Sequence, residues 1–268
     1  MSPYGFGNIS SRSIITGGNA AVLAARDVAA TLRLTARAML HLGDDDEITL
    51  IGGTVGIAGD PERRLPVAAV ASAVHTLPYL LALDLDVEPR LESTRTYRPR
   101  NVHQVPDSLG RMNTYTTYPY ALHASVVEVD PETGTVIPLR HVVTHDCGTV
   151  VNPMMVDGQV TGGVAMGLGA ALSEEIVLDA EGRPAALGFK TYLLPRATDL
   201  PRVELEHLCT PAPGTPLGAK GVGESGFSGA LAAVVNAVND ALSPLGVQLD
   251  SVPLSPATVL AAITGAQP

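Results

Sequence analysis

Hydrophobic positions along the chain form two kinds of run, which together predict helices and strands in one fold. Long apolar runs predict helices, whereas short β-branched runs bounded by Gly, Pro, Asn or Asp predict strands. The expected helices cover residues 19–42, 66–83, 225–242, part of 251–263, and a stretch that begins at Pro153 behind an Asn152 cap. The expected strands cover residues 48–51, 85–97, 121–129, 136–145, 174–178, 185–193 and 202–208. The fold class is therefore α+β, with mixed sheets and hairpins packed against helices.

Turn-forming residues separate several of these runs. Asp130 to Gly134 lies between two expected strands and predicts a hairpin. Asp179 to Gly182 predicts a second hairpin between residues 174–178 and 185–193. Residues 52–59, which contain several glycines, are expected to form a loop.

Composition and charge exclude several classes of protein. The chain has 268 residues and a formal net charge of −10, which argues against a nucleic acid or an anionic membrane as its main partner. No apolar run reaches the ~18 residues of a membrane span. The two cysteines, Cys147 and Cys209, lie far apart, so the sequence encodes no disulfide framework and no iron–sulfur or zinc site. These features favour a cytoplasmic protein without a metal site formed by its own side chains.

A glycine-dense segment, residues 215–226, delivers one carboxylate to the start of a long apolar helix. Its glycines at 218, 221, 223 and 226 allow positive φ values and close approach of a bound group. Glu224 is the candidate catalytic residue. The helix dipole stabilises its ionised form, whereas burial in a dry cleft stabilises the protonated form. A simpler interpretation makes Glu224 only a first-turn residue that matches the helix dipole.

Two nucleotide-binding patterns can be weighed against this segment. Residues 221–226 satisfy G-x-G-x-x-G, which is typical of dinucleotide sites when it follows a buried strand. Here it follows a proline-rich stretch, residues 209–214, which cannot be a central strand. The phosphate-loop pattern also fails, because Lys220 is followed by Gly221 and not by Ser or Thr.

The N-terminal residues contain a second candidate site. Ser10, Ser11, Arg12 and Ser13 crowd hydroxyls and a guanidinium just before an alanine-rich helix, a setting that suits a phosphate. The alternative is a helix-capping serine cluster with a surface arginine. No element precedes this turn to support it, which suggests that a partner supplies the missing elements.

The helix expected from Pro153 carries five glycines, at positions 158, 162, 163, 167 and 169. Each costs about 1 kcal/mol relative to alanine, so close helix packing or a buried ligand is needed to explain them. Gln159 would then be placed to bind that ligand. His123, His141 and His145 lie on or near the 121–145 hairpin and are interpreted as structural, because their spacing matches no metal-binding interval.

Four segments together resemble the molybdenum hydroxylases, the family of xanthine dehydrogenase, aldehyde oxidase and the carbon monoxide dehydrogenase large subunit. They are residues 5–18, residues 146–159, residues 218–224 and residues 252–256. Their order and spacing match the C-terminal portion of the molybdopterin-binding subunit across essentially all of residues 1–268. The resemblance implies the α+β fold of that portion, with subdomains of about 1–110 and 111–268.

The resemblance also implies a function for Glu224. It corresponds to the active-site glutamate, which accepts a proton as a water-derived oxygen attacks an electron-poor carbon of an aldehyde or an N-heterocycle. The implied cofactor is molybdopterin cytosine dinucleotide with molybdenum, whose metal is held by pterin sulfurs. The residues implied to contact the cofactor are Ser10, Ser11, Arg12, Ser13, Gln159, Lys220, Gly221 and Gly223.

Some features depart from the family pattern. The upstream part of the large subunit is missing, which favours a split subunit whose second molybdopterin-subunit chain completes the pocket. The expected partners also include a 2Fe–2S subunit and an FAD subunit, in a dimer of the heteromeric complex. Met166 and His145 replace the glutamine and aspartate of many members. The alternative function is a noncatalytic assembly module that binds no molybdenum.

Overall fold

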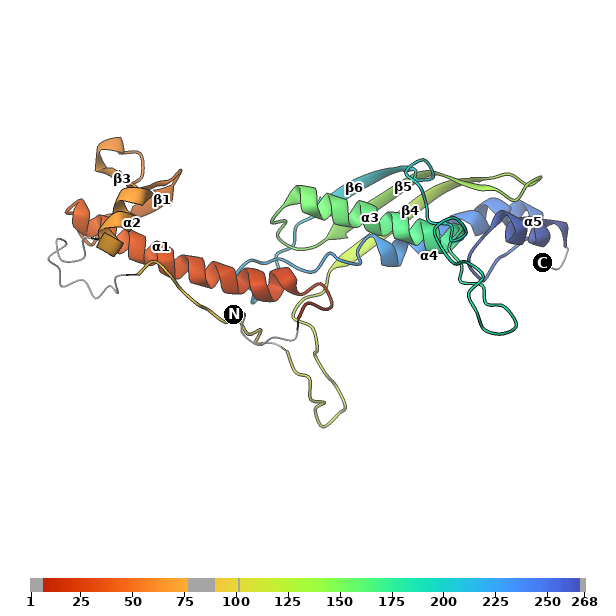
Figure 1. Ribbon diagram of the computed structural model, residues 1–268, viewed down its shortest axis with the longest axis horizontal. Coiled ribbons are helices and arrows are strands. Elements are labelled where there is room, and N and C mark those ends of the chain that lie inside the picture. The colour runs from red at the N-terminus through yellow and green to blue at the C-terminus, as the bar shows by residue number, and fades with distance from the viewer. Residues whose placement is uncertain (1–6, 77–89, 101, 266–268) are drawn as a thin grey trace. The chain divides into compact units, whose positions relative to one another are not determined.

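A computed structural model describes residues 7–76, 90–100 and 102–265 of the chain. Two compact units are present (Figure 1). The larger unit combines the N-terminal segment up to Ile15 with the chain from Arg100 onward, and the smaller unit spans Thr16–Pro99. Within the described residues, no helix has both the length and the apolar character needed to cross a bilayer.

The smaller unit packs two helices against a three-stranded antiparallel sheet. A π-helical turn, Ile14–Gly18, leads into helix α1 (Asn19–Met39). The remaining elements are β1 (Ile48–Ile51), β2 (Thr54–Ile57), the 3₁₀ turn Pro61–Arg63, β3 (Arg64–Pro66) and α2 (Val67–Thr76), with sheet order β1-β2-β3. The core of this unit is formed by Leu32, Ala36, Ile48, Val55 and Val70.

Three expectations for this unit need correction or limits. Residues 52–59 are not a loop, because Gly52 and Gly53 form the turn of a hairpin whose second strand is β2; both have positive φ, as two-residue hairpin turns require. The helix expected over 66–83 begins at Val67 and is described to Thr76, and its remainder lies outside the described residues. Within 85–97, the described residues 90–97 contain no strand.

The larger unit is built on a mixed three-stranded sheet. Strands β4 (Tyr120–Val129) and β5 (Val136–Asp146) form the predicted antiparallel hairpin, with Asp130 capping its turn by accepting from the Glu132 amide at 2.9 Å. Strand β6 (Arg202–Leu208) pairs with β5 in parallel. The side chains of β4 alternate between one face toward the helices and one exposed face, as expected for a sheet covered on one side.

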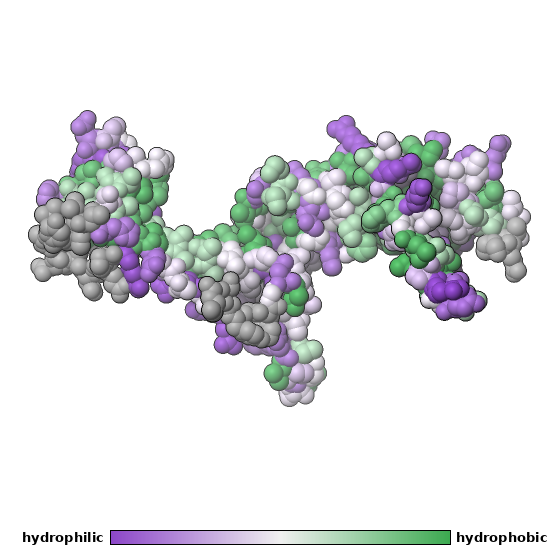
Figure 2. Space-filling view, in the orientation of Figure 1, coloured by the Kyte–Doolittle hydropathy of each residue, from purple (hydrophilic) through white to green (hydrophobic). Residues whose placement is uncertain are grey.

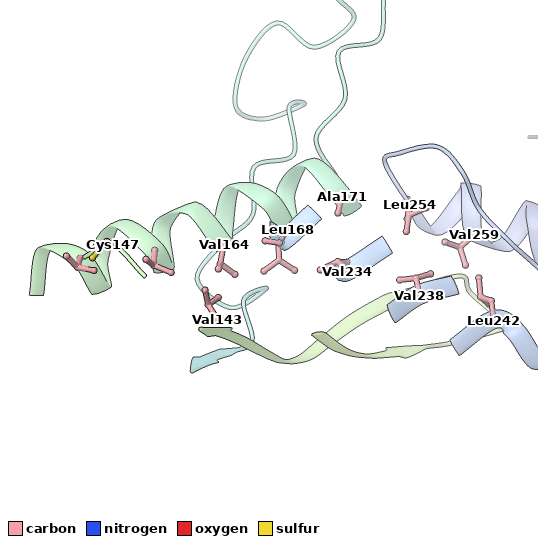
Figure 3. Packing of buried hydrophobic residues seen from close by; sticks show 13 residues of the cluster. Val143, Cys147, Val164, Leu168, Ala171, Val234, Val238, Leu242, Leu254 and Val259 are labelled. Atoms are coloured by element: carbon pink, nitrogen blue, oxygen red, sulfur yellow. The ribbon is translucent and has the colours of Figure 1, made fainter. Parts of the chain in front are cut away.

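Two long helices, α3 (Pro153–Leu172) and α4 (Phe227–Leu242), carry most of the apolar side chains of this unit's core. The Asn152 side chain caps α3 by accepting from the Met155 amide, as the sequence predicts. A 3₁₀ turn, Ser243–Leu245, and helix α5 (Pro256–Thr264) complete the unit. Figure 3 shows how the core side chains of α3, α4, β5 and the C-terminal segment interlock: they include Val143, Val164, Leu168, Val234, Val238, Leu242, Leu254 and Val259.

The second expected hairpin, residues 174–178 with 185–193, is wrong as a pair of strands. The structure has a single bridge there, between Leu178 and Pro184, around a turn in which Asp179 binds Arg183. The apolar side chains of this segment are exposed, with Leu187 at 88% and Phe189 at 86%. A two-stranded hairpin without a buried face is marginal, which explains the missing strands. The fold as a whole is α+β, as expected.

Candidate functional site

Glu224 lies immediately before helix α4. The Ser225 amide donates to the Val222 carbonyl at 3.1 Å, and the amides of Phe227 and Ser228 donate to the Glu224 carbonyl at 3.1 and 3.2 Å. These bonds wind residues 222–228 into the turn that opens the helix. Within this chain the Glu224 side chain is exposed on a cleft, and the helix N-terminus lies beside it.

The cleft separates α3 from this turn and has a volume of about 370 Å³. It is lined by Gly158, Gln159, Gly162, Met166 and the neighbouring Gly163 on α3, and by Gly223, Glu224 and Phe227 opposite them. Positions 158, 162 and 166 follow one another at four-residue spacing, so they share a face of the helix. A Cβ atom at Gly158 or Gly162 would meet no atom within 4 Å and would extend into open space.

Two other glycines of α3 have no room for a side chain. A Cβ at Gly163 would lie 2.8 Å from the Gly226 Cα, and one at Gly167 would lie 2.6 Å from the Ala230 Cβ. These two glycines therefore bring α3 close to α4. The expected close packing accounts for Gly163 and Gly167, whereas Gly158 and Gly162 border the cleft, where a ligand remains a prediction.

Three of the expected cofactor-binding residues meet at the end of the cleft. Gln159 Nε2 donates to the Gly223 carbonyl at 2.9 Å, and the Gly223 amide donates to Ser11 Oγ at 3.0 Å. A side chain at Gly223 would collide with the Ser11 hydroxyl, and a Cβ at Gly221 would lie 2.8 Å from the Ser11 Cβ. The N-terminal segment, the 221–226 turn and α3 are thus joined at one point.

The side chain of Lys220 is held in a buried ion pair. Its Nζ lies 3.1 Å from Asp146 Oδ2, and both side chains are buried. Burial alone would raise the pKa of the Asp146 carboxyl, but donors from Thr210, Gly148 and Lys220 outweigh it and lower that pKa to about 2. The Lys220 amide donates to the Cys147 carbonyl at 2.7 Å. Lys220 therefore anchors the start of the site turn to the end of β5.

The serine and arginine cluster is only partly joined to the cleft. The Arg12 guanidinium donates to the Gly7 carbonyl, at 2.7 Å from Nη2. Ser10 and Ser11 both have left-handed backbones, with φ of 51° and 55°, and the side chains of Ser10 and Ser13 are exposed. Ser11 is the member whose hydroxyl contacts the site turn.

Four histidines form two hydrogen-bonded chains; the sequence identified three of them, His123, His141 and His145, only as structural residues. His123 Nδ1 lies 3.1 Å from His141 Nε2, and His123 Nε2 lies 2.8 Å from the Ser225 carbonyl. His145 Nε2 lies 2.7 Å from His207 Nδ1, and His207 Nε2 lies 2.7 Å from Asp157 Oδ1. Each pair lies on neighbouring strands on the same face, so the register of the sheet brings the rings together.

Burial keeps the first of these chains uncharged. It lowers the pKa of His141 to about 4, with the neighbouring His123 ring as a second cause. Burial also lowers the pKa of His123, although the bond to the Ser225 carbonyl opposes this shift. Both imidazoles are therefore neutral near pH 7. Phe227, which lines the cleft, was foreseen only as part of a helix, since no spacing rule marks a lone aromatic residue as a site residue.

Comparison with known proteins places this geometry in a family. Residues 1–201 match the family described as molybdopterin cofactor-binding domain. The chain is 36% identical over 262 residues to the nicotine 6-hydroxylase large subunit of Paenarthrobacter nicotinovorans, covering 98% of this chain and 30% of that protein. It is 34% identical over 239 residues to the carbon monoxide dehydrogenase large chain of Afipia carboxidovorans, covering 89% of this chain and 27% of that protein.

The solved structures agree with the sequence comparison. Quinoline 2-oxidoreductase from Pseudomonas putida 86 matches with a TM-score of 0.82 and 33% identity, covering 98% of this chain and 31% of that one. The chain thus spans less than a third of the length of these relatives. From its sequence and its fold, the chain belongs to the molybdenum hydroxylase family and corresponds to a part of the large subunit.

Proposed function

We propose that this chain is the cofactor-binding, base-carrying part of a molybdenum hydroxylase, an oxidoreductase that is active together with partner subunits. The observation that carries the proposal is the cleft. Glu224 and Gln159 line it together with Gly158 and Gly162, which leave part of its wall without side chains. A flat cofactor with hydrogen-bonding edges needs such a wall together with amide groups at its rim.

The residues present fit a pterin cofactor. Gln159 and the Gly223 backbone lie on the cleft, and the Ser11 hydroxyl supports Gly223 from behind. We propose the cytosine dinucleotide form, with its phosphates near the exposed hydroxyls of Ser10 and Ser13. We also propose that the backbone of Gly221 and Lys220 lies near the cofactor, with the Lys220 ammonium group held in its ion pair with Asp146.

Glu224 would act as the general base of the reaction. When bound, the molybdenum cofactor supplies the two-electron oxidation and the activated oxygen. Glu224 holds its carboxylate at the mouth of the cleft, where it can accept the proton released in that step. Met166 and Phe227 give the cleft an apolar wall beside the carboxylate.

The substrate we propose is an N-heterocycle or an aldehyde, hydroxylated at an electron-poor carbon with oxygen derived from water. The relatives support this class through their names, which refer to nicotine and to quinoline. The proposed partners are a second molybdopterin-subunit chain, a 2Fe–2S subunit and an FAD subunit. They are supported by relatives named as large subunits or as a subunit of a dehydrogenase complex.

Replacing Glu224 with Gln in the assembled complex tests the catalytic assignment. We expect kcat to fall by roughly 10²–10⁴-fold, because glutamine cannot accept the proton, while molybdenum per complex stays unchanged. The assay is turnover of a panel of pyridines, quinolines and aromatic aldehydes with a dye as electron acceptor, beside metal analysis of the same samples. Glu128→Gln, at an exposed position on β4, is the matched control. Full activity in Glu224→Gln would remove Glu224 from the catalytic role.

A second candidate function is a noncatalytic assembly module. It is favoured by the many exposed apolar side chains of the chain. Metal analysis and release of CMP from the purified complex separate the two functions. One molybdenum and one CMP per chain rule out the module, and their absence from a correctly assembled complex rules out the hydroxylase.

A further inference from the structure

A chain of hydrogen bonds that passes through the buried His141 connects the sheet to the turn that carries Glu224. It begins at Ser125 Oγ, which lies 2.6 Å from His141 Nδ1. It continues from His141 Nε2 to His123 Nδ1 at 3.1 Å and ends with His123 Nε2 at 2.8 Å from the Ser225 carbonyl. Ser225 follows Glu224 directly, so the chain ends on the backbone of the site turn.

The Ser225 carbonyl fixes the direction of every bond in this chain. A carbonyl oxygen can only accept, so His123 Nε2 carries a hydrogen and donates it. In a neutral imidazole the other nitrogen then accepts, which makes His141 Nε2 a donor to His123 Nδ1. By the same step, His141 Nδ1 accepts from the Ser125 hydroxyl. Each ring nitrogen therefore has a matched partner, and neither imidazole needs a charge.

The helix is shaped to admit the His123 ring. A Cβ atom at Gly229, in the first turn of α4, would lie 2.7 Å from His123 Cγ and 2.8 Å from His123 Nε2. Any other residue at this position would push the ring away from the Ser225 carbonyl. Glycine near a helix start costs up to about 1 kcal/mol relative to alanine, so the space for the imidazole is gained at the expense of helix propensity.

We propose that His123 is the positioning residue for Glu224, with His141 and Ser125 holding its ring in the donating tautomer. The turn is held on its other side by α3, where a Cβ at Gly226 would lie 2.9 Å from the Val160 carbonyl carbon. Held between α3 and His123, the Ser225–Gly226 peptide keeps one orientation, and the carboxylate of the preceding Glu224 keeps its place on the cleft. This inference rests on the proposed role of Glu224, but the geometry of the turn can be measured without it.

The test compares His123→Leu with His123→Gln in the assembled complex. Leucine fills a similar volume without a donor, whereas the glutamine Nε2 can reach the position of the imidazole Nε2 and donate to Ser225. In His123→Leu we expect amide exchange of the Phe227 and Ser228 amides to become roughly fivefold faster, the effect of losing one hydrogen bond. We also expect kcat to fall more than KM changes, and His123→Gln to restore most of both quantities.

Hydrogen exchange followed by mass spectrometry of peptides over residues 222–230 supplies the first readout, and steady-state kinetics the second. His103→Leu, at an exposed position in the same unit, is the control and should change neither. If His123→Leu does not assemble, Ser125→Ala is measured in its place and should change the same quantities in the same direction.

Unchanged exchange over residues 222–230 overturns the proposal. A uniform increase over all of α4 and the sheet overturns it too, because that result marks a merely structural histidine. The exchange readout separates this inference from the proposed function. If Glu224→Gln stays active while His123→Leu loosens only this turn, His123 still positions the turn and the catalytic assignment alone fails.

Discussion

Asp146 and Lys220 illustrate how much a single buried pair contributes to the site. Among the ion pairs between described residues, theirs has the least exposed side chains, at 10% and 8%. Asp146 also accepts from the Gly148 and Thr210 amides at 2.8 and 3.2 Å. Removing one partner of such a pair leaves an uncompensated buried charge, which costs far more than losing an exposed pair. The start of the site turn thus depends on a residue at the end of β5.

The first prediction at this scale concerns acid stability. Because the folded pKa of Asp146 is about 2, below its ordinary value of 3.8, its contribution to stability is present above about pH 4 and is lost as the pH falls toward 2. Asp146→Asn should lower the free energy of unfolding by about 3 kcal/mol at pH 7 and should flatten its pH dependence in that window. Denaturant unfolding at a series of pH values measures both effects.

Glu204→Gln provides the control for that experiment. Glu204 binds Arg140 at 2.7 Å, but the two side chains are 35% and 56% exposed. Breaking an exposed pair should cost less than about 1 kcal/mol. Equal losses in the two variants would show that the buried position of Asp146 does not matter.

At the scale of elements, helix α3 combines two opposite uses of glycine in neighbouring positions. Gly162 faces the cleft, where an added Cβ would meet nothing within 4 Å. Gly163 faces α4, where an added Cβ would lie 2.8 Å from the Gly226 Cα and from the Phe227 nitrogen. One position is kept small by the cleft and the other by packing, and a matched pair of substitutions can separate them.

Gly162→Ala should leave the fold intact or stabilise the helix by up to about 1 kcal/mol, and Gly163→Ala should destabilise it by about 1–3 kcal/mol. An added methyl group at Gly162 would occupy space in the cleft where we propose that the cofactor binds. Gly162→Ala should therefore reduce the molybdenum content of the assembled complex despite its stable fold. Thermal unfolding and metal analysis of the two variants measure these effects. A stable Gly163→Ala variant would contradict the close packing of α3 against α4.

The same scale explains which elements could be predicted from the sequence. The hairpin of β4 and β5, strand β6 and the two long helices follow from apolar runs, clear turns and the Asn152 cap, and all are confirmed. Strand β2 was missed because its glycine neighbours looked like a loop, and residues 174–193 fail to form strands because no surface covers their apolar side chains. Local pattern cannot report whether a covering surface exists.

The site likewise contains residues that the sequence identified and contacts that it could not predict. Glu224, Gln159, Gly223 and Ser11 were named from motifs, and the structure brings them together. The burial of Lys220 against Asp146 could not be foreseen, because it depends on a contact between distant segments. The histidine chain to Ser225 also needed the register of β4 and β5 and the packing of α4 on that sheet.

At the scale of the whole molecule, the exposed apolar surface is the dominant feature. Figure 2 shows apolar side chains on the surface of the chain. Large apolar residues that are at least 60% exposed in the larger unit include Ile9, Val105, Leu109, Tyr120, Leu122, Met154, Met166, Ile176, Leu187, Phe189 and Leu193. So many exposed large apolar side chains favour an interface on this unit. The relatives are more than three times as long, so the proposed occupant is the remainder of a large subunit.

The segment around Leu187 and Phe189 gives that proposal a direct test. Both side chains lie almost fully in water, an arrangement that favours burial by about 1.5–3 kcal/mol for each residue once a partner covers it. The double variant Leu187→Asp and Phe189→Asp should therefore weaken assembly with the proposed second molybdopterin-subunit chain by at least tenfold, measured by titration of the two purified chains. Lys190→Ser, an exposed polar change in the same segment, should leave the affinity unchanged.

Oxidative footprinting adds an independent check. Met154 and Met155 are 73% and 64% exposed here, and they should become protected in the complex only if the partner covers the start of α3. Unchanged affinity in the double variant would mean that this segment stays in solvent and that assembly uses another face.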